Sequence, residues 1–352
     1  MKKLLVALGV TVICSLGAVS SADAAATYTV APRITYEPQG NLYKEVARPV
    51  NMGVGADITP PDGSTTVLPL MNSTLTMPKT LAFVPDPNMP VCTAVNAENA
   101  NFPPETARSL CATSLIGDGS ADLYLAGQLS SKITDPVLSL FNGGKNAQGG
   151  GIIIIQAYSA STGAGIYQSG SITNGVLSVD TPRLTADSAS PNYQLNIPGE
   201  VGLDQSYVQV SCPDGSLKTD ITYHLGNRDA VGTVSNATTV TADQQVTPCN
   251  GLAGKPTFAN LKVKAPKKVK NGKKGSFKVT VTNKGTASSK KGTVKASGAG
   301  KGTANLPVIK PGATKTVTVK AKVTGKKGKK VAVKFKASGG ASASGSTKVK
   351  VG

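Results

Sequence analysis

The sequence predicts an all-β protein, built from a β-sandwich body and a second, C-terminal β-sandwich. Val, Ile, Leu and Thr recur in short runs, and the 39 Gly and 22 Pro residues punctuate them. No segment after residue 24 keeps a helical period. Trp is absent and aromatic residues make up 4% of the chain, yet the apolar runs are too frequent for a disordered protein.

The first 24 residues have the three parts of a secretory signal. Lys2 and Lys3 precede an apolar run over residues 4–19 and a small-residue triplet at residues 22–24. The apolar run is shorter than the ~20 residues that a membrane-spanning helix needs. We therefore expect cleavage after the triplet, no transmembrane segment in the remaining chain, and an extracellular or cell-surface location.

Cysteine usage agrees with export to an oxidising compartment, where disulfides form. Four cysteines alternatively suggest zinc, but none are spaced Cys-x-x-Cys and the only histidine is His224, so we expect no metal. Four cysteines allow three disulfide pairings, and the pairing that closes two local loops is favoured. The four cysteines beyond the signal are Cys92, Cys111, Cys212 and Cys249. The favoured pairing joins Cys92 with Cys111 and Cys212 with Cys249.

Charge divides the chain near Gly254. Residues 255–352 contain 26 lysines and no Arg, Asp or Glu, whereas residues 25–254 contain 10 basic and 18 acidic groups, a balance of −8. So abrupt a change in composition, at a stretch that contains Gly and Pro, indicates a domain boundary. We predict a signal at 1–24, an acidic body at 25–254 of one or two sandwich units, and a lysine-rich module at 255–352.

The lysine-rich module shows about seven short alternating runs, the number expected of an immunoglobulin-like sandwich. In the run 277–282, a period of two places Phe277 and Val279 on one face and Lys278 on the other. The other clear runs are 314–323, 330–337 and 347–351.

Two turn signatures in this module carry a family resemblance. A run ending in Asn283-Lys284-Gly285 follows Asn271-Gly272, and a later Pro311-Gly312 turn leads into the run that starts at Thr314. This order resembles the CARDB family over the last ~95 residues. The resemblance implies an Ig-like module of the kind found in secreted and cell-surface proteins. For function, it implies a role in adhesion or as a spacer.

Lysines at alternate strand positions have two explanations. They keep the surface soluble and protect sheet edges, or they bind a polyanion. The absence of acidic residues favours binding, because a solvated surface needs no such one-sidedness. The predicted partner is an anionic cell-envelope polymer or an acidic polysaccharide, bound by Lys278, Lys320, Lys322, Lys334, Lys336, Lys348 and Lys350.

Other anionic partners are weighed against this one. Base readers use arginine and stacking aromatics, and the module has no arginine and no interleaved aromatic residues, so we expect no specific nucleic-acid recognition. The acidic body of the same or a neighbouring chain is a third candidate, and it would cause salt-sensitive self-association.

The body also reads as short strands, at residues 27–30, 65–68, 75–77, 151–157, 206–210 and 221–225. Among them, Ile152–Ile155 is continuously apolar and predicts a strand buried on both faces. The stretch from Met77 to Ala121 resembles a group of uncharacterised exported β-rich proteins of actinobacteria. That resemblance supports pairing of Cys92 with Cys111, although Ala112 stands where the group commonly has proline.

Catalytic signatures are scarce. His224 lies in a strand-like run, no Gly-x-Ser-x-Gly elbow occurs, and Asp118–Asp122 favours a polar turn over a calcium loop. We predict no catalytic, cofactor or metal residues, and a secreted or surface-associated binding or structural protein. The alternative is an exported enzyme acting on polysaccharide through paired carboxylates, retained by the basic module.

Overall fold

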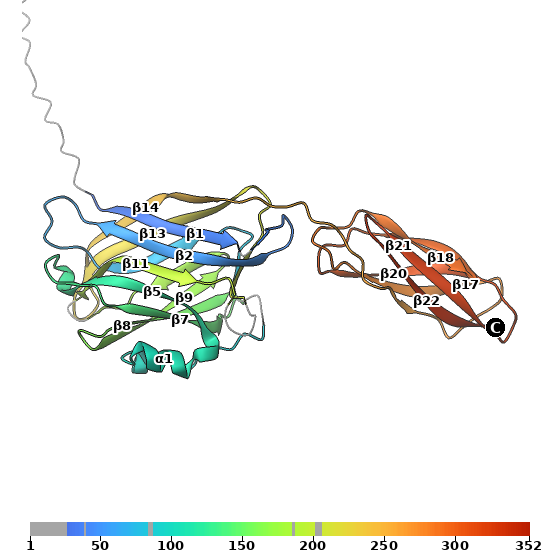
Figure 1. Ribbon diagram of the computed structural model, residues 1–352, viewed down its shortest axis with the longest axis horizontal. Coiled ribbons are helices and arrows are strands. Elements are labelled where there is room, and N and C mark those ends of the chain that lie inside the picture. The colour runs from blue at the N-terminus through green and yellow to red at the C-terminus, as the bar shows by residue number, and fades with distance from the viewer. Residues whose placement is uncertain (1–26, 39, 84–86, 185–186, 201–205) are drawn as a thin grey trace, which may run out of the picture.

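The described part of the chain folds into two β-sheets and one short α-helix (Figure 1). The computed structural model describes residues 27–38, 40–83, 87–184, 187–200 and 206–352, so the predicted signal at 1–24 lies outside the described residues. One sheet has 14 strands and the other has 8, which confirms the all-β prediction. Within the described ranges, no helix has the length and apolar character to span a bilayer.

The larger sheet belongs to the body. Its hydrogen-bonded path runs β14-β13-β3-β10-β9-β8-β7-β5-β11-β2-β12-β4, with β1 added on β2 and β6 on β5. Its strands are β1 (Thr29–Pro38), β2 (Arg48–Thr59), β3 (Leu70–Thr76), β4 (Ala82–Phe83), β5 (Leu115–Tyr124), β6 (Lys132–Ile133), β7 (Val137–Lys145), β8 (Gly151–Ser159), β9 (Ala164–Thr173), β10 (Val176–Asp180), β11 (Ala189–Ile197), β12 (Val208–Val210), β13 (Ser216–Arg228) and β14 (Val234–Pro248).

This sheet folds over on itself into two layers (Figure 1). β1, which pairs with β2 near one end of the path, also lies beside β14 at the other end. A single core fills the space between the layers, and β1, β2, β3, β5, β7 to β14 all contribute to it. The body is therefore one sandwich unit. The sequence alone leaves open whether it contains one unit or two.

The continuous apolar run in β8 is buried on both faces, as predicted. Ile153 and Ile155 face the main core, whereas Ile154 packs in a second cluster with Phe141 on the opposite side of the sheet. All three isoleucines are at most 5% exposed. A strand with two buried faces requires a cover on its outer side.

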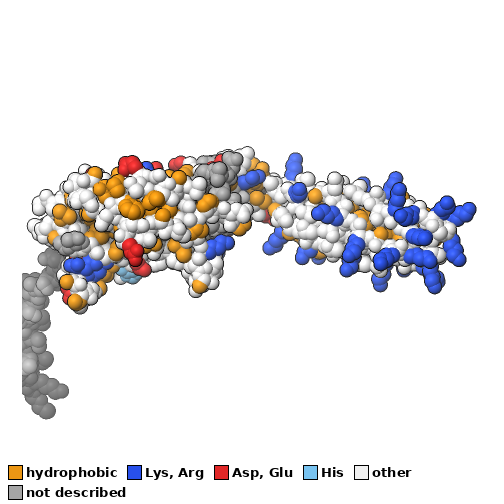
Figure 2. Space-filling model, turned by 90° about the horizontal axis from the view of Figure 1, so that it is seen from below, with side chains coloured by type: hydrophobic (Ala, Val, Ile, Leu, Met, Phe, Trp, Pro, Cys, Tyr) orange, Lys and Arg blue, Asp and Glu red, His pale blue; other side chains and the backbone are white. Residues whose placement is uncertain are grey.

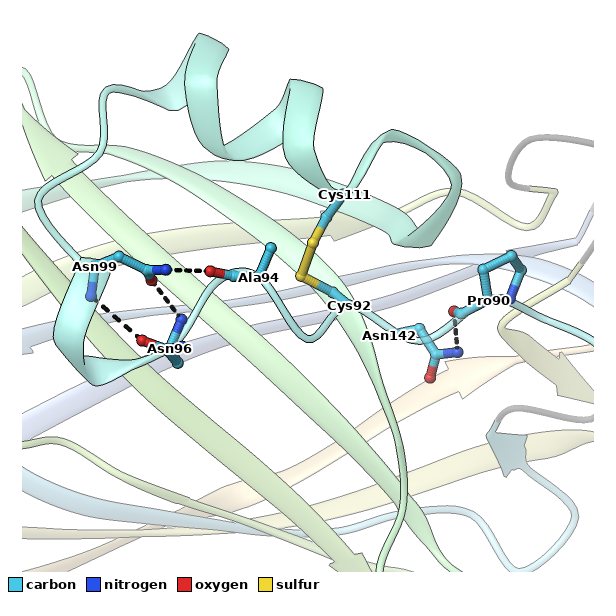
Figure 3. Close-up of a disulfide and its surroundings, with 7 residues drawn as sticks. All are labelled: Pro90, Cys92, Ala94, Asn96, Asn99, Cys111 and Asn142. Atoms are coloured by element: carbon cyan, nitrogen blue, oxygen red, sulfur yellow. Dashed lines mark hydrogen bonds between the residues drawn. A yellow bond between two sulfur atoms is a disulfide. The ribbon is translucent and has the colours of Figure 1, made fainter.

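That cover is the segment before β5, which contains α1 (Pro104–Leu110) and the Cys92–Cys111 disulfide (Figure 3). The buried Asn142 amide donates to the carbonyl of Pro90 over 2.7 Å, and the Gln156 amide donates to the carbonyl of Ala100 over 3.0 Å. These polar side chains satisfy loop carbonyls that burial would otherwise leave without partners. The outer layer is thus attached by side chains of β7 and β8 as well as by the disulfide.

The second sheet forms the lysine-rich module, in the order β15-β17-β20-β19-β18-β21-β22-β16. β19 pairs with β18 along its length but with β20 only at Gly300 and Lys301, so the strands form two layers that pack face to face. The strands are β15 (Lys262–Lys264), β16 (Lys268–Val269), β17 (Lys274–Thr282), β18 (Gly292–Gly298), β19 (Gly300–Leu306), β20 (Thr314–Val323), β21 (Lys330–Ser338) and β22 (Ser342–Val351).

A valine-rich core lies between these two layers. Its largest fully buried members are Phe277 and Phe335, whose ring centroids are 5.3 Å apart. No buried hydrophobic residue is shared between this core and that of the body.

The chain passes from body to module over a short, anchored connection. The Cys212–Cys249 disulfide closes the end of β14 onto the body, and the Leu252 N–H donates to the Leu42 carbonyl over 2.9 Å. On the module side, the Thr286 N–H donates to the carbonyl of Lys255 over 2.9 Å. Both predicted disulfide pairings are confirmed, and the second of them fixes the exit from the body.

Two local expectations are wrong. The run 65–68 forms only an isolated bridge at Thr66 instead of a strand. Asp118–Asp122 is not a turn but the middle of β5, because Gly119 allows β5 to approach β11 closely: a Cβ there would lie 2.1 Å from the Gln194 carbonyl oxygen.

Because the two cores are separate, a cavity in one should leave the other intact. Phe335→Ala removes a buried ring and should destabilise the module by ~3–5 kcal/mol. Calorimetry of the full chain should show the module transition at lower temperature and the body transition unchanged. The exposed, uncharged Ser342→Ala is the control and should shift neither by much. Two transitions that move together in Phe335→Ala would show that the sandwiches unfold as one unit.

Candidate polyanion-binding surface

The seven predicted lysines do not form one patch. Lys278, Lys320 and Lys322 project from β17 and β20, whereas the other four project from β21 and β22. Since the two layers pack their apolar faces against each other, the two groups lie on opposite outer surfaces of the module. We call the surface of β15, β17 and β20 the first face, and that of β16, β18, β21 and β22 the second face.

The first face brings further lysines beside the predicted ones. Lys264 lies directly opposite Lys278 on the neighbouring strand, and Lys274 lies directly opposite Lys322. All project outward because the intervening positions are buried. The exposed lysines of this face are Lys262, Lys264, Lys274, Lys278, Lys320 and Lys322.

The second face repeats the arrangement with more lysines. Lys295 of β18 lies opposite Lys336, and Lys350 lies between Lys330 and Lys268. Lys334 and Lys348 are diagonal neighbours across β21 and β22. The exposed lysines of this face are Lys268, Lys295, Lys330, Lys334, Lys336, Lys348 and Lys350.

This placement costs stability. Side chains directly opposite in an antiparallel pair have Cβ atoms ~4.5–5.5 Å apart, and like charges there repel. The module has no Asp or Glu to offset them, and the three ion pairs found among the described residues all lie in the body. Figure 2 shows Lys and Arg side chains distributed over the module without any acidic side chain among them. An anionic polymer lying along either face would relieve this repulsion.

Aromatic side chains are not part of this surface. The module contains only three, Phe258, Phe277 and Phe335, and they are 7%, 0% and 1% exposed. Base stacking needs an accessible ring. The surface consequently offers ammonium groups and hydroxyls. These groups suit the binding of anionic groups and not the recognition of nucleic-acid bases.

The sequence prediction missed six of the 13 lysines that share these faces. β18 was not among the clear runs, so Lys295 was not assigned, and β15 and β16 are too short to show a period. Only the pairing of strands places Lys295 opposite Lys336. A lysine on a very short strand gives no indication in the sequence of which residue lies opposite it on the neighbouring strand.

The acidic body does not cover these faces in the same chain. The module extends away from the body (Figure 1). Their polar contact is at the near end, where the Ser288 N–H donates to the Glu45 carboxylate over 3.1 Å and the Ser288 hydroxyl donates to the same oxygen. None of the ion pairs found among the described residues joins the two domains. Self-association between chains stays a prediction.

Other residues singled out for chemistry lie apart from one another. His224 is on β13, and its Nδ1 is 3.0 Å from the Thr239 hydroxyl on β14. Asp122 is ion-paired with Lys132 over 2.9 Å. Over the described ranges, no three His, Cys, Asp or Glu residues group in a way that could hold a metal ion.

Comparison with known proteins bears on the module. Residues 258–348 match the CARDB family model. This confirms the predicted resemblance, and it agrees with the Ig-like sandwich of β15 to β22. No curated protein matches the chain. The resemblance of the body to exported actinobacterial proteins stays a prediction.

Among solved structures, the chain is similar to a crystal structure of a mutant Salmonella alpha-2-macroglobulin, with 11% identity and a TM-score of 0.22. The match covers 91% of this chain and only 16% of that protein. A score this low says nothing about the fold of the chain.

Replacing one member of an opposed lysine pair tests the repulsion. Lys336→Glu should raise the melting temperature of the module at low salt, because it exchanges repulsion with Lys295 for attraction. Lys336→Gln should give a smaller rise, and molar salt should remove most of both differences by screening. If Lys336→Glu melts at or below the wild-type temperature in low salt, the lysines of this face do not repel measurably.

Proposed function

We propose that this protein is a non-catalytic binding or structural protein of the cell exterior, and that its lysine-rich module retains it on an anionic envelope polymer. The observation that carries the proposal is the placement of opposed lysines on two outer faces with no acidic residue in the module. A surface needed only for solubility would intersperse both signs of charge.

Two further features support a place outside the cytoplasm. The chain has two disulfides, which persist in oxidising compartments. Its C-terminal region matches the CARDB family, which suggests a cell-surface type of module. Retention by charge would be reversible, because the attraction between exposed charges falls with ionic strength.

Two opposite faces favour a polymer over a small anion. A flexible chain can follow one face and continue to the other, or join two molecules. Along a strand, Lys334 and Lys336 are two residues apart, which corresponds to ~7 Å between charges. Repeated charges at this spacing suit a polymer with an anionic group in each unit.

Polyphosphate and heparin are suitable probes. In low salt, each should raise the melting temperature of the module, since a ligand that binds only the folded state stabilises it. A variant with Lys295, Lys334, Lys336 and Lys348 changed to Gln should lose most of this shift if the second face dominates. The matched control changes Lys264, Lys278, Lys320 and Lys322 of the first face and removes the same charge.

The outcome of that comparison identifies the binding face. Equal losses would mean that both faces bind. No upward shift of the wild-type melting temperature with either probe would overturn the proposal, as would retention of the protein on cells in molar salt.

The proposed absence of catalysis has its own test. A shallow hollow beside Arg108 has two carboxylates on its wall, Asp118 and Glu200, so a hydrolytic site would be sought there first. We expect purified protein to hydrolyse none of a panel of polysaccharides. Hydrolysis that disappears in both Asp118→Asn and Glu200→Gln would instead establish the enzyme alternative.

A further inference from the structure

A cavity of about 130 Å³ lies inside the body, between its two layers. Strands β2, β3, β5 and β7 to β11 all contribute to its wall. Of the 29 described residues that line it, 21 are apolar, and the most buried are aliphatic side chains at most 5% exposed. These include Met52, Val54, Leu75, Leu138, Leu140, Ile153, Ile155, Leu177 and Ile197.

Small side chains account for part of this space. Ala121 of β5 and Ala157 of β8 both line the cavity, and each contributes only a methyl group.

An apolar cavity of this size has a known preference. An engineered protein cavity of ~150 Å³, lined by Leu, Ile and Phe, stays dry and binds benzene. Water needs two to four polar partners, which the deep aliphatic wall does not supply. The cavity therefore suits an apolar group of about six carbon atoms in preference to water.

The outer end of the cavity is polar and opens at the turn between β8 and β9. Thr162 and Ala164 are exposed there, and Ser159 and Ser190 lie nearby on the lining. The Ser159 hydroxyl donates to Asp135, so its oxygen can still accept a hydrogen bond from a hydroxyl at one end of a ligand. The other polar residues of the lining are Ser73, Asp122, Gln168, Thr181 and Ser188.

Charges at this end disfavour an anionic ligand. Among the described residues of the lining, Asp122 is the only charged one, and it is paired with Lys132. Beside it, the Asp135 carboxylate accepts hydrogen bonds from the Ser159 hydroxyl and the Ser161 N–H, each over 2.7 Å. These bonds lower the pKa of Asp135, first through the Ser161 N–H and then through Ser159, so the carboxylate stays ionised. The lining itself offers no cation to a fatty acid or phosphate group.

We propose that the body binds one uncharged small molecule in this cavity, with an alkyl or aryl part among the aliphatic side chains and a hydroxyl-type end at the Ser159–Thr162 turn. This site is separate from the lysine faces, and the proposal does not depend on polyanion binding. The protein would then carry a neutral apolar ligand on the body and an anionic polymer on the module.

Binding is tested on the purified full chain with 1-hexanol, hexanoate and benzene as probes, by titration calorimetry and ligand-detected NMR. We expect saturable one-to-one binding of 1-hexanol and benzene, in competition with each other, and at least tenfold weaker binding of hexanoate. No saturable binding of either neutral probe, or binding of hexanoate as tight as that of 1-hexanol, would overturn the proposal.

Substitutions locate the site. Ala157→Leu places a larger side chain in the cavity and should weaken 1-hexanol binding at least tenfold. Because overpacking can destabilise the fold, a second pair of variants is needed. Ile155→Ala and Ile154→Ala remove the same atoms from adjacent residues that are each 5% exposed, but only Ile155 lines the cavity.

The enlarged cavity in Ile155→Ala should favour longer alcohols, so that the affinity of 1-nonanol relative to 1-hexanol rises severalfold. Ile154→Ala should keep the wild-type preference. If the two variants change chain-length preference equally, or neither changes it, the alcohols do not bind in this cavity. The melting shift of the module with polyphosphate should be the same in both variants, which separates a failure here from a failure of the proposed retention.

Discussion

Every strand has two faces, and most features of this protein depend on which of them is buried. In the module, the buried inward positions of β17, β20 and β21 hold small or apolar residues, mostly valine together with Phe277 and Phe335. The lysines between them must point outward, and antiparallel pairing then sets lysines such as Lys295 and Lys336 opposite each other. Charge crowding on the module follows from strand register as much as from composition.

The body uses the same alternation with a different result. β7 and β8 are buried on both faces because the disulfide-bonded segment before β5 covers their outer side. Polar residues on these strands, Asn142 and Gln156, serve as anchors for the cover. On the inner side, the small side chains of Ala121 and Ala157 leave volume between the two layers. β8 thus contributes Ala157 to the cavity wall on one face and Gln156 to the outer layer on the other.

The connection between the domains keeps these features in one elongated molecule (Figure 1). Leu252 is bonded to the body and Lys255 to the module, so the free stretch of chain is very short. Gly254 lies against Thr286, where a Cβ would be 2.2 Å from the carbonyl oxygen. The short connection and the contact between Glu45 and Ser288 hold the module by its near end. Both lysine faces therefore stay clear of the body. In the proposed arrangement, a polymer can lie on the module without obstructing the opening near Thr162.

The sequence by itself determined the all-β class, the strand faces of β17, β20, β21 and β22, the pairing of the cysteines and the burial of β8 on both faces. These depend on local periodicity, on a change in composition, or on loop length, which are all present in a linear string. Only the tertiary structure decided that the body is one unit, that the lysines divide between two faces, and that Lys264 and Lys295 join them. It also placed Asp118–Asp122 within a strand and revealed the cavity. Each of these depends on which strands pair, and pairing between segments far apart in the chain is set by the burial of the whole core and not by any single run.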